Sequence, residues 1–162
     1  MSEIMLGQRV ETHDKLDVMV GHWCAEDVSD SDRPHEVEQA TAAIAGGSEE
    51  SGSEEIHEWV PDGFFLVHRW DATVGELAFK GTEIVGYEPA RGDFFTRFFD
   101  QSDGRRECRA SADGNMLTFK EPNSRATVAL TDEGTSLDIA WEWREDGSDW
   151  LPLCDLVSRR AQ

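Results

Sequence analysis

The sequence predicts an all-β fold: one antiparallel up-and-down barrel of about ten strands, preceded by a short helix. Half-apolar segments of strand length fill most of the chain, and a turn signal separates them every 8–12 residues or so. Asp-Gly and Asp-x-Gly sequences between the segments supply the positive φ angles that tight hairpins need. No intervening stretch is long enough for the crossover helix of a parallel sheet. A small barrel has an interior, and that interior can hold a small molecule.

The N-terminal elements are expected in the following order. Residues 1–12 are expected to be a flexible terminus, and a helix is expected over 11–20. Leu16, Met19 and Val20 form its apolar stripe, and Thr12 or Asp14 is available as its N-cap. The first strand follows over 21–28, a turn-rich loop over 29–35 and a moderate strand signal over 36–45. Residues 46–55 contain only Gly, Ser and Glu, so we interpret them as an acidic mobile loop or a solvated edge.

The alternation of apolar and polar residues becomes sharper from residue 56 onward. Pro61-Asp62-Gly63 is a turn sequence, and Pro89-Ala90-Arg91-Gly92 ends the longest strand signal. Further strands are expected at 56–60, 64–71, 77–88, 93–100, 105–110, 116–121, 125–130, 137–144 and 149–159. A chain of 162 residues is expected to form a single domain over its whole length, 1–162.

Composition excludes several classes of partner. The net charge is −19, from 34 acidic and 15 basic residues, so binding to nucleic acid or to an anionic membrane is not expected. There is no apolar run of membrane-spanning length and no signal-peptide start, and we expect a cytoplasmic protein. Cys24, Cys108 and Cys154 lack any CxxC spacing and are interpreted as reduced thiols. His35 and His57 lack metal-ligand spacing to each other or to a cysteine, so no metal and no cofactor are expected.

Alternation also predicts which side chains face the barrel interior. The more apolar face of each strand should point inward, and on three strands that face carries tryptophan, phenylalanine and a few polar groups. A mostly apolar lining with a few fixed polar groups is typical of a small-molecule pocket, although it is also the composition of a filled core. The residues expected to line a ligand are His68, Trp70, Phe79, Glu83, Tyr87, Trp141 and Trp143.

His68 and Glu83 are the candidates for acid–base chemistry. If the turn at 72–75 pairs residue 70 with 79, His68 lies opposite Gly81 and diagonal to Glu83. Gly81 would then leave room for a ligand beside the imidazole. A histidine next to a carboxylate in an apolar barrel can act as a general acid or base. The simpler interpretation is a buried histidine that is satisfied by a structural acid.

The strand expected at 93–100 carries phenylalanine on both faces, with Phe94 and Phe98 opposing Phe95 and Phe99. Apolar side chains on the outer face indicate that a loop or a second chain covers it. A homodimer through the 93–99 strand is therefore an alternative to ligand binding.

Several segments together resemble a known family. These are residues 16–23, which end in Gly21-His22-Trp23 at the start of the first strand, residues 59–65, residues 81–88, and residues 138–160 with their Trp-Glu-Trp. In order and spacing they are similar to the calycin superfamily of lipocalin-like barrels, and within it to the DUF1579 family of uncharacterised bacterial proteins. The resemblance implies that Trp23 packs across the closed barrel end against Arg159 or Arg160. Haem-binding relatives, the nitrobindins, use a late histidine as axial ligand, but the last histidine here is His68, so haem is not expected.

The expected function is therefore binding of a small, largely apolar or aromatic molecule inside the barrel. One alternative is an isomerase, cyclase or hydrolase that uses His68 and Glu83, and another is a non-binding homodimeric interaction protein.

Overall fold

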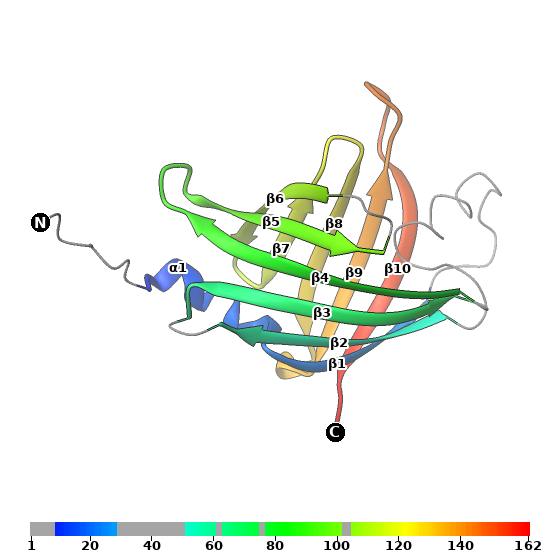
Figure 1. The fold of residues 1–162 in the computed structure, drawn as a ribbon. Helices are drawn as coiled ribbons and strands as arrows, with labels where there is room; N and C mark the ends of the chain where they lie inside the picture. Colours follow the sequence, from blue (N-terminus) through cyan, green and yellow to red (C-terminus); the bar gives the residue numbers. More distant parts are fainter. Residues whose placement is uncertain (1–8, 29–50, 61–62, 75–76, 102–104) are drawn as a thin grey trace, which may run out of the picture.

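The computed structural model describes residues 9–28, 51–60, 63–74, 77–101 and 105–162, which form a closed antiparallel β-barrel (Figure 1). Ten strands follow one another around the barrel in chain order, and β1 closes it by pairing with both β2 and β10. This confirms the predicted fold class. Within the described ranges, no helix has the length and apolar character needed to span a bilayer.

The described elements have the following bounds. The helical segments are α1 (Glu11–Asp14), η1 (Asp17–Met19) and η3 (Asp132–Gly134). The strands are β1 (Gly21–Asp27), β2 (Ser51–Trp59), β3 (Phe65–Val74), β4 (Leu77–Glu88), β5 (Asp93–Asp100), β6 (Arg105–Asp113), β7 (Met116–Lys120), β8 (Ser124–Thr131), β9 (Ser136–Trp143) and β10 (Leu151–Arg160).

The N-terminal helix is shorter than the continuous helix predicted over 11–20. One turn of α-helix, α1, is followed by the 3₁₀ turn η1. The N-cap is Val10 rather than Thr12 or Asp14, and its backbone N–H donates to Nδ1 of His13 at 3.1 Å. His13, Leu16 and Met19 are buried at intervals of three, which a 3₁₀ turn aligns on one face.

The acidic segment differs from the prediction in part. Residues 51–55 belong to β2 instead of forming a loop; all five pair with β3, and residues 52–55 also pair with β1. Neighbouring strands supply the backbone hydrogen bonds, so this segment needs no apolar residues of its own to form a strand. Residues 46–50, the expected loop at 29–35 and the expected strand at 36–45 lie outside the described residues.

The β3–β4 hairpin has a different register from the one considered above. Its pairing continues to Val74 and Leu77, and His68 lies directly opposite Glu83. Trp70 lies opposite Gly81, and a Cβ atom at Gly81 would overlap the Trp70 indole. The space above Gly81 is therefore filled by Trp70, and the expectation that it leaves room beside His68 is wrong.

The main hydrophobic core lies at the barrel end that the helical segments cover (Figure 1). Trp23 is fully buried there, and its Nε1 donates to the Met19 carbonyl at 2.8 Å. The Arg160 guanidinium lies 4.2 Å from the centroid of the Trp23 ring and donates to the backbone carbonyls of Val18, Val20 and Gly134. This confirms the cation–π contact that the resemblance implied, with Arg160 as the partner, whereas Arg159 pairs with Glu26. The buried residues of this core are Leu16, Met19, Trp23, Leu66, Val85, Phe94, Ala110, Leu117, Val128 and Leu137.

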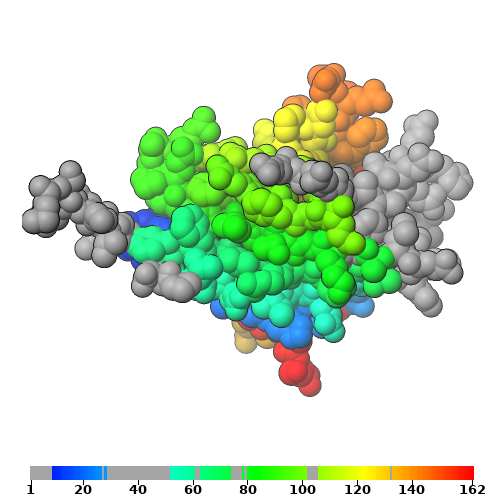
Figure 2. Space-filling model, viewed as in Figure 1, coloured from blue at the N-terminus to red at the C-terminus, as the bar shows by residue number. Residues whose placement is uncertain are grey.

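The two faces of β5 are now assigned. Phe94 is buried inside the barrel, whereas Phe99 on the opposite face is 46% exposed. Phe95 also faces outward, and its ring contacts Phe65 at a centroid distance of 6.5 Å above Gly86. This outer surface belongs to the wall of β3, β4 and β5, which is continuous in Figure 2. A homodimer through this strand stays a prediction.

Candidate functional site

A cluster of four titratable side chains lies inside the barrel on three adjacent strands. Glu55 and His57 come from β2, His68 from β3 and Glu83 from β4. Cross-strand pairing sets His68 between His57 on one side and Glu83 on the other. Glu55 precedes His57 by two residues, so it points to the same face of the sheet. We call these four residues the histidine–glutamate cluster.

His68 is the centre of this cluster. Its Nδ1 lies 3.0 Å from Oε2 of Glu83, and its Nε2 lies 3.5 Å from Oε2 of Glu55. The His57 ring stacks on the His68 ring, with centroids 4.0 Å apart and an angle of 10° between the planes. The four side chains are largely shielded from solvent; His57 is 4% exposed and Glu83 is 6% exposed.

The proximity of the two carboxylates determines the protonation state of His68. Burial alone would lower the pKa of His68, but the hydrogen bonds and negative charges of Glu55 and Glu83 outweigh burial and raise it to about 9. Burial likewise opposes ionisation of Glu55, yet the contact with His68 holds the Glu55 pKa at about 2. Burial and the charge on His68 together lower the pKa of His57 well below its usual range. At neutral pH, His68 is therefore an imidazolium and His57 is neutral.

Two polar atoms of the cluster have no hydrogen-bond partner among the described residues. They are Nδ1 of His57 and Oε1 of Glu83, and both are buried. Nε2 of His68 has only the Glu55 carboxylate, at 3.5 Å. Buried polar atoms are usually satisfied, and each one left unpaired costs about 1–3 kcal/mol. The cluster therefore has unused capacity to bind a polar group.

Aromatic side chains border the cluster on the side away from the helical segments. The Trp70 ring lies 5.2 Å from His68 and 6.4 Å from Phe98, both measured between centroids. Arg106 lies over Phe98 at 5.2 Å and is near the carboxylates of Asp100 and Glu121. This half of the interior thus combines flat apolar surfaces with charged groups.

The structure brings only some of the predicted lining residues together. His68 contacts both Trp70 and Glu83, so these three predicted residues lie together. Tyr87 lies instead at the covered end, where its ring contacts His13 and Phe94. Trp141 and Trp143 pack against Leu153 and Cys154 in a second apolar cluster, and the buried Nε1 of Trp143 has no partner within the described ranges. The side chain of Phe79 lies outside the described residues.

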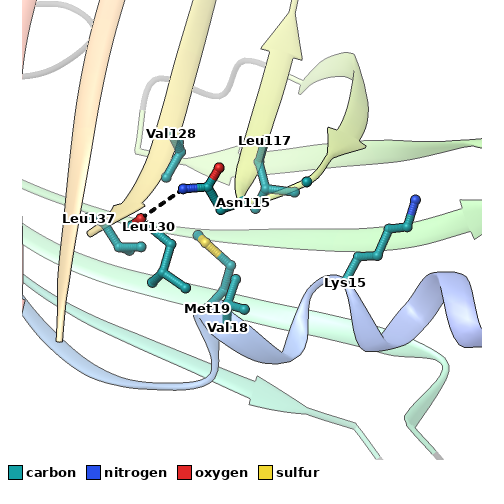
Figure 3. A pocket seen from close by; sticks show the side chains of 9 residues that line it. Lys15, Val18, Met19, Asn115, Leu117, Val128, Leu130 and Leu137 are labelled. Carbon is teal, nitrogen blue, oxygen red and sulfur yellow. Dashed lines mark hydrogen bonds between the residues drawn. The ribbon is translucent and has the colours of Figure 1, made fainter. Parts of the chain in front are cut away.

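A small cavity opens at the helix-covered end of the barrel, between η1 and strands β7, β8 and β9 (Figure 3). Its volume is about 20 Å³, which is space for roughly one water molecule. Met19, Leu117 and Val128 contribute apolar walls, and Asn115 donates to the Leu130 carbonyl at its edge. This cavity is too small for an organic ligand and lies apart from the predicted site.

Glu55 and His57 were not among the predicted site residues. Glu55 falls in the low-complexity acidic segment, and His57 has no partner at metal-ligand spacing along the chain. The signal that could have identified them is Trp59, a large aromatic residue two positions after His57 on the same strand. In the structure Trp59 packs on the main core and donates to Asp17 at 2.7 Å. Once Trp59 faces inward, the period of two along β2 brings His57 and Glu55 inward as well.

Comparisons with known proteins identify no family: no protein-family model matches the chain, and no curated protein matches it.

Proposed function

We propose that this barrel binds a small, largely apolar molecule with one polar group, in the half of its interior that lies beyond the main core. The observation that carries the proposal is the position of the unpartnered cluster atoms beside Trp70 and Phe98. Aromatic side chains bury the flat apolar part of a ligand efficiently, and a few convergent polar groups orient it. The buried Glu83 Oε1 would accept a hydrogen bond from the polar group of such a ligand.

The test uses the neutral fluorescent probe N-phenyl-1-naphthylamine with the purified, chelator-treated full chain. We expect saturable binding that is weakened by Phe98→Ala, because the Phe98 ring faces Trp70 inside the barrel. Phe99→Ala is the matched control, because Phe99 is its sequence neighbour on the outer face. Absence of binding, or equal weakening by both substitutions, would overturn the proposal. Native mass spectrometry of the protein as purified would then reveal the class of any ligand that it retains.

The geometry also bears on the alternative of an enzyme that uses His68 and Glu83. Their contact at 3.0 Å would orient the His68 imidazole for acid–base chemistry. With its pKa raised to about 9, His68 would donate a proton at neutral pH rather than accept one. Hydrolysis of phenyl acetate, whose leaving group gains more from a proton donor than p-nitrophenolate does, is a simple test, and turnover that survives His68→Gln would contradict this role.

A further inference from the structure

We propose that Glu55, His57 and His68 form a binding site for one divalent transition-metal ion, with zinc as the reference ion. Each residue offers one donor atom, and the three donors lie within 4.8 Å of one another. Two imidazole nitrogens and one carboxylate are the donor set of many zinc and iron sites that keep open coordination positions. The inference concerns the same interior as the proposed function, but it does not require an organic ligand.

The distances already approach those of a bound ion. Two donors that are each about 2.1 Å from a tetrahedral ion lie about 3.4 Å apart. Nε2 of His68 and Oε2 of Glu55 are separated by 3.5 Å. Nδ1 of His57 is buried and has no hydrogen-bond partner among the described residues, so it is available as a donor atom for a metal ion. Because an ion must lie near the plane of each ring, at least one imidazole has to rotate out of the His57–His68 stack.

Glu83 would position His68 for this role. A metal-binding histidine usually donates its second ring N–H to a carboxylate, which fixes its tautomer and its orientation. The 3.0 Å contact between Nδ1 of His68 and Oε2 of Glu83 provides this arrangement, and it leaves Nε2 directed toward Glu55. On binding, the ion replaces the proton on Nε2, and that proton is released to solvent.

Charge favours a divalent ion in this position. Two acidic side chains, Glu55 and Glu83, lie within 3.5 Å of the His68 ring in a shielded interior. A divalent ion with two neutral imidazoles and the same carboxylates makes the total charge zero. Compensation of buried charge stabilises the occupied site relative to the empty one.

The experiment is a titration of the chelator-treated full chain with ZnCl₂ in the presence of millimolar Mg²⁺, which occupies the acidic surface. We expect one tightly bound zinc ion per chain, with affinity reduced at least about tenfold by Glu55→Gln or His57→Gln and about 10–100-fold by Glu83→Gln. Glu54→Gln is the matched control, because Glu54 is the sequence neighbour of Glu55 on the outer face of β2. Absence of binding, or binding that is unchanged in the Glu55 and His57 variants, would overturn the inference.

A measurement on the unmodified chain guards against variants that fail to fold. Histidine ring ¹⁵N resonances report directly on metal coordination, and the chain contains five histidines. We expect zinc to shift the His57 and His68 resonances and to leave the exposed His22 unchanged. Shifts confined to other histidines would contradict the assignment. The naphthylamine test uses metal-free protein, and the zinc titration uses no organic ligand. Failure of the ligand proposal and failure of the metal proposal can therefore be distinguished.

Discussion

Removal of the charge on His68 tests whether the histidine–glutamate cluster is a buried ion network. In the metal-free protein the His68 ring lies between two carboxylates, at 3.0 Å from Glu83 and 3.5 Å from Glu55. A single ion pair at about 4 Å is worth about 4 kcal/mol at an effective dielectric constant of about 20. Breaking a buried pair by removing one partner typically costs 3–5 kcal/mol, because an uncompensated charge is left behind. We therefore expect His68→Gln to lower the free energy of unfolding by about 3–5 kcal/mol.

The dependence of this loss on pH separates charge from packing. The variant Glu55→Gln/His68→Gln/Glu83→Gln has no charge in the cluster, and it should recover much of the stability. In His68→Gln, Glu55 loses the contact that holds its pKa at about 2 while burial still opposes its ionisation, so its pKa rises and it binds a proton as the pH falls. A folded state that gains protons is stabilised at low pH, so the deficit of His68→Gln relative to the triple variant should be smaller at pH 5 than at pH 7.

Urea unfolding with a chelator present measures both effects, and the six tryptophans of the chain provide the fluorescence signal. His22→Gln is the matched control, since His22 is an exposed histidine on β1. A loss below about 1 kcal/mol at pH 7, a deficit relative to the triple variant that is the same at pH 5, or a triple variant no more stable than His68→Gln would each refute the reasoning.

Three further predictions follow from the same contacts. The pKa of His68 is raised to about 9 in the fold, so its stabilising contribution should be complete below pH 6.5 and lost as the pH rises to about 9. Urea unfolding should show this decline for the wild type and should not show it for the triple variant. Gly81→Ala should cost about 1–3 kcal/mol in thermal unfolding, because the new Cβ overlaps the Trp70 indole, whereas Gly52→Ala meets its nearest neighbour at 3.4 Å and should cost less than about 1 kcal/mol. Exposed Cys24 should react with a disulfide reagent in the native protein, whereas Cys108, whose pKa burial raises to about 11, should react only after unfolding; equal rates would contradict its burial.

Alternation and turn chemistry were sufficient to predict the barrel. Leu77–Glu88 and Asp93–Asp100 have the predicted bounds, because turn sequences flank each of these strands. The hairpin between β3 and β4 shows the limit of this reasoning. Apolar periodicity alone does not fix which residues are paired across it, and the observed register is the one that fits the Trp70 indole over Gly81.

The candidate site was predicted only in part for a related reason. His68 and Glu83 lie on strongly apolar strands, so their inward direction follows from their neighbours along the chain. Glu55 and His57 lie on a strand whose own composition indicates solvent exposure. Their position depends on pairing with β1 and β3, which is a property of the closed barrel rather than of residues 51–59.

The inner face of β2 is the strongest sign that this interior serves more than stability. Ile56, the most apolar side chain in the middle of β2, faces outward and is 44% exposed, while His57 beside it is buried. Apolar residues of similar volume in place of a buried charge network are often neutral or stabilising. Trp59 holds the register at the covered end, so an apolar residue at position 55 or 57 would have been buried without any change of fold. A barrel built only to be stable would not need two carboxylates and two imidazoles there, and their presence favours the proposals of a ligand or metal ion that requires them.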